Sequence, residues 1–208
     1  ADLRCHDPAI AALTPEIRRE RTLALEQLAR RAVGPALITA SATWQDLLAH
    51  SYLLLSTGAA GSQQRTEAWI SADVSVADAG GRRPEGWWYA GARHLEDLPP
   101  AEGLAAEAAR RALSQVNAAP AATGRTMILV EAMAAGTLLS HLLRALDGQG
   151  VQQERSWLGS RQGLPVASPA LTLTDEPLLQ RCLGSRFFDG EGMAARPFSV
   201  MEQGVLRG

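Results

Sequence analysis

Lysine is absent from this sequence, and all 20 of its basic residues are arginines. The absence excludes a lysine-dependent phosphate loop, a Schiff-base enzyme and a lysine nucleophile. Cysteine is scarce as well, because Cys5 and Cys182 are the only thiols and lie far apart in the chain. Two such thiols form neither a disulfide framework nor a four-cysteine zinc site, and we expect both to be reduced, as in a cytosolic protein.

The few histidines are also scattered. They lie at least 44 positions apart and are His6, His50, His94 and His141. No two of them are one helical turn apart, so no helix face with two histidines can bind a metal ion. G-x-S-x-G, G-x-G-x-x-G and EF-hand motifs are absent too. The sequence therefore identifies no candidate catalytic, metal-binding or cofactor-binding side chain.

Neither charge nor hydrophobicity is extreme. The net charge is −2, and 46% of the 208 residues are hydrophobic. This balance is typical of a globular protein of one large or two small domains, and it argues against general nucleic-acid binding. No apolar run approaches the roughly eighteen residues of a membrane helix, and the first residues do not resemble a signal peptide. We expect a soluble, cytoplasmic protein that does not contact membranes.

The first half predicts an antiparallel sheet with covering helices. Alternating apolar and polar residues from Ala68 to Val76 indicate a strand with one buried face. Thr14-Pro15 is typical of a helix start, and Gly34-Pro35 of a helix end. The expected elements are a helix between these two signals, a meander of strands at Thr43 to Leu55, Ala68 to Val76 and Trp87 to Tyr89, and an alanine-rich helix from about Ala101 to Val116.

Two features of this half remain open to interpretation. The triplet Trp87-Trp88-Tyr89 is either a ligand platform or a set of rings packed against a covering helix, and we favour packing. Residues 117–124, with their proline and glycine, are typical of a linker. We therefore expect one domain at residues 1–122 and a second at residues 123–208.

The second half predicts a mostly β domain with one central helix, which makes the whole chain α+β. The expected elements are a buried strand at Arg125 to Glu131, a leucine-rich helix at residues 138–146 ended by Asp147-Gly148, a strand at Ala170 to Thr174 and a hairpin from Phe198 to Leu206. Asp189 and Glu191 bracket a glycine and could hold a cation weakly, but a turn explains them. The short last arm of the hairpin leaves an open edge, which suggests that the chain is a fragment or that something else completes the sheet.

Several segments resemble the TldD/PmbA family, and they occur in that family's order over nearly the whole chain. They are residues 7–13, 86–89, 92–95, 138–148, 166–175 and 184–192. The resemblance implies a metallopeptidase built from two related subunits, TldD and TldE (PmbA), that cleaves or matures peptides. It also implies a link to modulators of DNA gyrase. Family chains are longer than this one, in agreement with the unfinished hairpin.

In TldD-type subunits, the resemblance implies, the central helix carries a His-Glu pair and a second His that bind a metal ion and activate water. The family's register places Leu139, Ser140 and Arg144 at these positions. Leucine has no lone pair, serine is a poor zinc ligand and arginine stays protonated. We therefore expect a non-catalytic PmbA/TldE-like subunit without a cofactor of its own, and zinc or a similar divalent ion in a TldD-type partner.

The expected partners are a TldD-type catalytic subunit or a second copy of the chain, and a peptide that could add to a sheet edge. The alternative is an independent regulatory protein of the gyrase-modulator type that acts without proteolysis. The missing basic stripe argues against direct DNA contact in that case. A third possibility is an enzyme whose metal ligands lie outside this segment.

Overall fold

The computed structural model describes residues 2–207, which divide into two compact units. The first unit comprises the chain up to Pro120 together with Pro177–Ala195, and the second comprises Ala121–Glu176 and the chain from Arg196 onward. Both units mix helices with antiparallel strands, which confirms the predicted α+β class. The segment 177–195 lies in the first unit, although its position in the sequence groups it with the second half.

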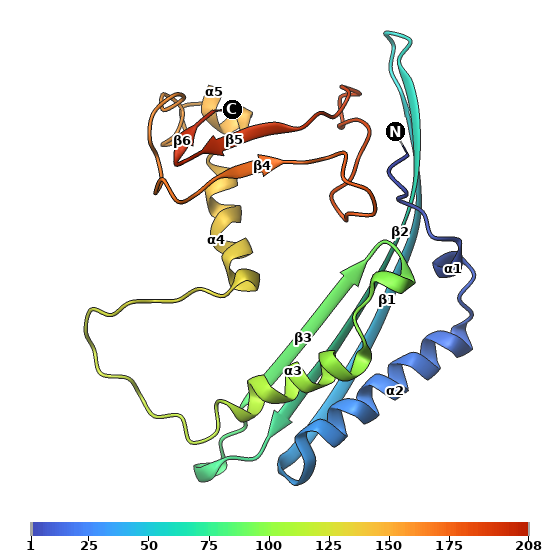
Figure 1. The fold of residues 1–208 in the computed structure, drawn as a ribbon, viewed down its shortest axis with the longest axis vertical. Helices are drawn as coiled ribbons and strands as arrows, with labels where there is room; N and C mark the ends of the chain where they lie inside the picture. The colour runs from blue at the N-terminus through green and yellow to red at the C-terminus, as the bar shows by residue number, and fades with distance from the viewer. Residues whose placement is uncertain (1, 208) are drawn as a thin grey trace. The chain divides into compact units, whose positions relative to one another are not determined.

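The first unit is built on a three-stranded antiparallel sheet (Figure 1). Its strands are β1 (Leu37–Leu54), β2 (Ala60–Val76) and β3 (Glu85–Ala92), in the order β1-β2-β3, which confirms the predicted meander. β1 and β2 pair along their whole length, whereas β3 pairs with β2 only from Ala68 to Ser75. The outer part of the β1-β2 hairpin is therefore a two-stranded ribbon.

Two helices cover one face of this sheet (Figure 1). Helix α2 (Pro15–Val33) begins where Thr14 Oγ1 accepts a hydrogen bond from the Ile17 amide, and it ends at Gly34, whose φ is +72°, as predicted. Helix α3 (Ala101–Leu113) lies beside it. The core between helices and sheet is formed by Leu25, Ala29, Val33, Ile70, Ala72, Val74, Val76, Leu104, Ala105, Ala108, Ala109 and Ala112.

A glycine on β3 permits the close approach of α3. A Cβ atom on Gly86 would lie 2.3 Å from the backbone nitrogen of Ala112. Only a residue without a side chain allows sheet and helix backbones to come this close. The helix ends at Leu113 rather than at the predicted Val116, because the following amides close shorter turns: Gln115 donates to the Ala112 carbonyl at 3.2 Å and Val116 to the Leu113 carbonyl at 3.1 Å.

Segment 177–195 is held in the first unit by a buried arginine. The Arg93 side chain is 2% exposed and forms an ion pair with Glu67 at 3.1 Å. Its guanidinium also donates to the carbonyl oxygens of Cys182, at 3.2 Å, and of Leu183. A buried guanidinium needs such partners for its several donors, and these partners come from distant parts of the chain. Arg93 therefore connects residues 182–183 to the sheet.

Short helical turns complete the first unit. Helix α1 (Pro8–Ala11) begins at Asp7, whose carboxylate accepts from the Ala9 amide at 2.9 Å. The 3₁₀ turns are η1 (Gly34–Ala36), η2 (Ala79–Gly81) and η3 (Leu95–Asp97).

The second unit contains helices α4 (Ala132–Arg144) and α5 (Gly148–Gln152) and a sheet of β4 (Leu173–Asp175), β5 (Phe198–Glu202) and β6 (Val205–Leu206). These strands are antiparallel in the order β4-β5-β6, and the predicted hairpin is confirmed. Its turn uses Gln203 and Gly204 with φ of 46° and 78°, the left-handed geometry that suits a two-residue hairpin loop. Among the helices of residues 2–207, none has the length and apolar character needed to cross a membrane.

The predicted buried strand at Arg125 to Glu131 is wrong. These residues form no strand in the structure, and the side chains of Met127 and Leu129 are 94% and 96% exposed. A run of four apolar residues satisfies its backbone as a strand only where a neighbouring strand pairs with it. Within residues 2–207 this segment pairs with no strand.

Other boundaries in the second unit also differ from the expectation. Helix α4 ends at Arg144, and Asp147 caps the separate helix α5 through the Gly150 amide at 3.0 Å. The strand expected from Ala170 begins at Leu173, because the Leu171 amide closes a turn onto the Ser168 carbonyl.

The open hairpin edge is likewise a wrong expectation. The Leu206 amide donates to the Leu164 carbonyl at 3.1 Å, and the Leu206 carbonyl accepts from Gly163 at 2.8 Å. A segment from earlier in the chain therefore pairs with the outer side of β6, which sequence proximity does not reveal.

Candidate functional site

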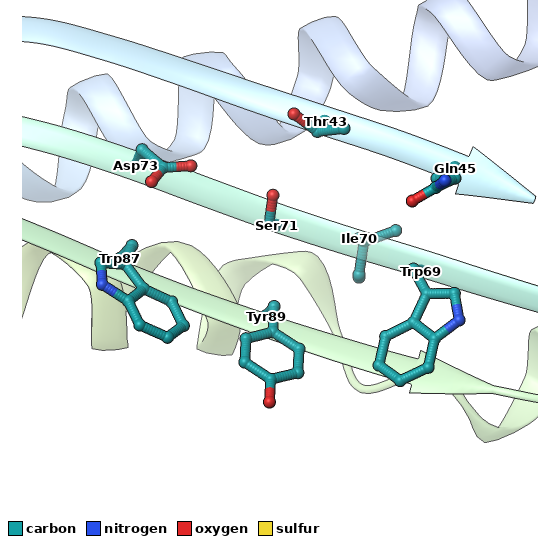
Figure 2. A pocket seen from close by; sticks show the side chains of 8 residues that line it. All are labelled: Thr43, Gln45, Trp69, Ile70, Ser71, Asp73, Trp87 and Tyr89. Atoms are coloured by element: carbon teal, nitrogen blue, oxygen red, sulfur yellow. The ribbon is translucent and has the colours of Figure 1, made fainter. Parts of the chain in front are cut away.

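The sheet face opposite α2 and α3, here called the open face, carries polar and aromatic side chains (Figure 2). Side chains alternate between the two faces of a strand, so the strand register defines which residues share the open face. The register gives four cross-strand rows: Thr39-Ser75-Glu85, Ser41-Asp73-Trp87, Thr43-Ser71-Tyr89 and Gln45-Trp69-Gly91. β1 contributes hydroxyl and amide groups, whereas β3 contributes aromatic rings.

Three aromatic rings form a continuous surface on this face. The ring centroids of Trp87 and Tyr89 are 5.6 Å apart with 15° between the planes, and those of Trp69 and Tyr89 are 6.0 Å apart at 40°. A Cβ atom on Gly91 would lie 2.3 Å from the Trp69 ring, so this glycine leaves space for the indole above β3. The Trp87 side chain remains 52% exposed and available for contact.

A hollow of about 320 Å³ lies beside these rings (Figure 2). It is lined by Thr43, Gln45, Trp69, Ile70, Ser71, Asp73, Trp87 and Tyr89. Rings on one side and hydroxyl, amide and carboxyl groups on the other are the usual composition of a binding surface.

Asp73 is the charged group of this hollow. Burial raises the pKa of the Asp73 carboxyl, and the nearby negative charge of Glu85 raises this pKa further. Within residues 2–207 the Asp73 carboxylate has no hydrogen-bond or ion-pair partner, in contrast to Asp46, which is paired with Arg18 at 2.6 Å. Asp73 and Glu85 therefore give one end of the open face an uncompensated negative charge.

The aromatic triplet of the sequence is divided between the two faces. Trp88 packs against the helical core, where the Arg111 guanidinium lies 4.1 Å from its ring centroid. Trp87 and Tyr89 lie on the open face. The prediction that the triplet packs against a covering helix is confirmed for Trp88 and wrong for the other two.

Sequence reasoning did not single out Trp69 and Asp73 as site residues. The available signal was their shared phase with Ser71, opposite to that of Ala68, Ile70 and Ala72. That phase assigns them to the polar face of β2. Which residues of β1 and β3 lie beside them follows only from the strand register.

The three family-register positions lie on α4. Leu139 is half-buried, Ser140 Oγ donates to the Thr137 carbonyl at 2.7 Å, and Arg144 is exposed. His141 is exposed on the same helix. This set does not fit a divalent metal ion, because it offers at best one weak hydroxyl ligand beside a permanent cation. Among residues 2–207, no group of three or more His, Cys, Asp and Glu side chains could hold a metal ion.

The remaining candidate residues have structural roles or stand apart. Asp189 accepts hydrogen bonds from the amides of Glu191 and Met193, each at 2.9 Å, which confirms the turn interpretation. Cys5 is buried, Cys182 is exposed, and both are free thiols.

Family models match both halves of the chain. The PmbA/TldA metallopeptidase central domain matches residues 9–116, and the PmbA/TldA metallopeptidase C-terminal domain matches residues 123–208. The fold and these matches define a protein of the metallopeptidase-like class. The chain belongs to the PmbA/TldD family.

Individual relatives agree with this assignment. Metalloprotease PmbA of Escherichia coli O157:H7 is 27% identical over 131 residues, which are 63% of this chain and 29% of that protein. A PmbA homologue of Buchnera aphidicola is 29% identical over 119 residues, 57% of this chain and 27% of that protein. The matches therefore cover about a third or less of these relatives.

Solved structures extend the similarity to the complete chain. A candidate modulator of DNA gyrase from Bacteroides thetaiotaomicron is 32% identical with a TM-score of 0.92, over 100% of this chain and 47% of that chain. TldE from Thermococcus kodakarensis, 21% identical with a TM-score of 0.77, shares the fold over 98% of this chain and 46% of that one. This chain spans about half the length of these structures.

Proposed function

We propose that this chain is a non-catalytic, PmbA/TldE-like part of a TldD-type metallopeptidase, and that it helps to hold a peptide for a catalytic partner. The observation that carries the proposal is the set of side chains on α4. In the register that the family resemblance implies, Leu139, Ser140 and Arg144 take the positions of the metal ligands and the base, and their side chains cannot supply these groups.

The surroundings of α4 support an association with a partner. None of its described side chains is buried, and Leu138 is 58% exposed. Exposed leucines on an amphipathic helix are typical of a surface that another protein covers. In this proposal the divalent metal ion, zinc or a similar one, belongs to the TldD-type partner, and the complex acts in the cytoplasm.

The test is reconstitution with a TldD-type subunit. Sedimentation of the mixture at micromolar concentrations measures association, and cleavage of a peptide substrate is followed with each component alone and with both. We expect a complex, with cleavage that depends on the partner and is abolished by a chelator. A Leu138→Arg variant should weaken the complex. The matched Leu54→Arg variant, at a site 80% exposed on the β1-β2 hairpin, should not.

The name of the Bacteroides relative favours a second candidate, a regulator of a topoisomerase that acts without proteolysis. That function would be retained without a TldD-type partner and in the presence of a chelator. If no complex forms and a chelator-insensitive effect on DNA gyrase is measured, the subunit proposal is wrong and the regulator is supported.

A further inference from the structure

We propose that the open face of the β1-β2-β3 sheet binds an extended peptide segment through a basic side chain, arginine or lysine, which lies against Trp87 and Tyr89 and reaches the carboxylate of Asp73. The inference rests on the proposed function only in taking a peptide as the ligand. The chemistry of the site concerns this chain alone.

Geometry places ring and carboxylate side by side. Asp73 on β2 is the direct cross-strand partner of Trp87 on β3, and such partners have Cβ atoms about 4.5–5.5 Å apart. Tyr89 follows on the same face and stacks with Trp87 at 5.6 Å between ring centroids. A guanidinium over these rings therefore gains a cation–π contact with the rings and a charge-assisted hydrogen bond to the Asp73 carboxylate.

Charge selects a cation over a neutral or acidic group. Asp73 lacks a partner within residues 2–207, and Glu85 adds a second negative charge in the adjacent row. On the same face of β2, Arg65 lies beyond Trp69 and is paired with Glu67 at 3.7 Å. The raised pKa of Asp73 reflects desolvation and the like charge of Glu85, and a bound cation would offset the like charge.

The position of β3 explains how an extended chain could reach the rings. β3 is an outer strand of the sheet, and no other strand within residues 2–207 pairs with its free edge. A peptide added at this edge would form main-chain hydrogen bonds, and every second side chain would lie on the open face. Trp87 and Tyr89 lie on β3 and not on β1. The free edge of β3 is therefore the edge that brings a ligand side chain to these rings.

The experiment is calorimetric titration of the complete 208-residue chain, without any TldD-type partner, with a blocked hexapeptide in which arginine alternates with threonine. The comparison peptide carries citrulline, the uncharged isostere, in place of each arginine. We expect the arginine peptide to bind at least about tenfold more tightly, because citrulline loses the cation–π and charge-assisted terms.

Variants locate the site. Trp87→Ala and Asp73→Asn should each weaken the arginine peptide about tenfold. Their matched controls are Trp157→Ala, an aromatic ring 61% exposed in the second unit, and Glu20→Gln, an exposed carboxylate on α2. Both controls should stay within about twofold of the original affinity, because neither residue lies on the open face.

Three results would overturn the inference: equal affinity for the two peptides, unchanged affinity in both site variants, or Trp87-dependent binding of a neutral oligosaccharide without binding of the peptide. The outcome is separable from the reconstitution test. Loss of the complex with a TldD-type subunit would leave arginine recognition by this chain in place, and failure of arginine recognition would leave the complex in place.

Discussion

Helices α3 and α4 have the same length, 13 residues, and both are rich in alanine and leucine. Yet α3 buries five side chains, and α4 buries none of those described. Both sequences carry an apolar stripe at helical spacing. The difference is that α3 lies on a sheet, with Gly86 opposite Ala112, whereas α4 has no comparable contact with another element of the second unit among the described residues.

The same contrast holds for the two units. The first unit has a continuous core of strand and helix residues, whereas among the described residues of the second unit the buried apolar side chains are Leu158, Val200, Met201 and Leu206. Because burial of apolar area is the main stabilising term, we expect the first unit to be the more stable. An amphipathic pattern therefore identifies a face that can be buried, and the tertiary structure determines whether it is.

The largest expected effect comes from removing Arg93. Arg93→Met should destabilise the first unit by about 3–5 kcal/mol, because Glu67 and the carbonyl of Cys182 lose their buried cation. Urea unfolding measures the loss, and hydrogen exchange should rise first in residues 177–195. The exposed Arg207→Met is the control and should change stability by less than about 0.5 kcal/mol. Unchanged protection of residues 177–195 would show that Arg93 does not hold this segment.

The second prediction compares the two helices directly. Leu104 on α3 is 2% exposed, and Leu138 on α4 is 58% exposed. Leu104→Ala should cost about 3 kcal/mol through lost burial and the cavity left behind. Leu138→Ala should cost less than about 0.5 kcal/mol. Denaturant midpoints measure both, and similar losses would mean that α4 is packed as tightly as α3.

The third prediction concerns Gly204, a glycine of the second unit that has no room for a side chain. Gly204 has a φ of +78°, and a Cβ atom there would lie 2.3 Å from the Ala167 carbonyl oxygen. Gly204→Ala should cost about 2 kcal/mol, from left-handed strain and the clash together. Gly163 has a φ of +80° with nothing within 4 Å of such a Cβ. Gly163→Ala therefore measures the strain alone, about 1 kcal/mol, and equal losses would exclude a contribution from the clash.

The smallest effect concerns acid stability of the first unit. The hydrogen bond from Arg18 lowers the pKa of Asp46 below its ordinary value of 3.8, against the opposing effect of burial and with help from Trp44. A lowered pKa stabilises the fold above pH 3.8, and this contribution is lost as the pH falls through the folded-state pKa. Asp46→Asn should cost up to about 1 kcal/mol at pH 7, because the pair is partly exposed.

The pH dependence checks this assignment. Denaturant midpoints of the Asp46→Asn variant and the parent chain should converge as the pH is lowered below 3.8 and through the folded-state pKa of Asp46. A difference that stays constant from neutral to acidic pH would show that the carboxylate charge of Asp46 does not contribute.

Local signals in the sequence were reliable where they act through the backbone. Thr14, Pro15 and Gly34 define the ends of α2, and the alternation around Ile70 defines β2. These predictions succeeded because capping, restricted φ and side-chain alternation depend on neighbouring residues. The apolar run at Met127 failed because a strand also needs a partner, and no local pattern supplies one.

The candidate site shows the same division. Each strand of the open face was predicted, but the rows that join Asp73 to Trp87 and Trp69 to Gly91 depend on register. A shift of one residue would move Trp87 into the helical core and Trp88 out of it.

By itself, the sequence determined the main helices and strands of the first unit, the α+β class, the resemblance to the PmbA/TldD family and the chemical unfitness of Leu139, Ser140 and Arg144 as metal ligands. Tertiary structure alone decided that Arg93 would hold residues 182–183, that Gly163 and Leu164 would pair with β6, and that rings and carboxylates would share one sheet face. The physical reason is the distance along the chain over which each interaction acts. Caps, turns and side-chain chemistry act over a few residues, whereas pairing and burial join residues that are far apart in the chain.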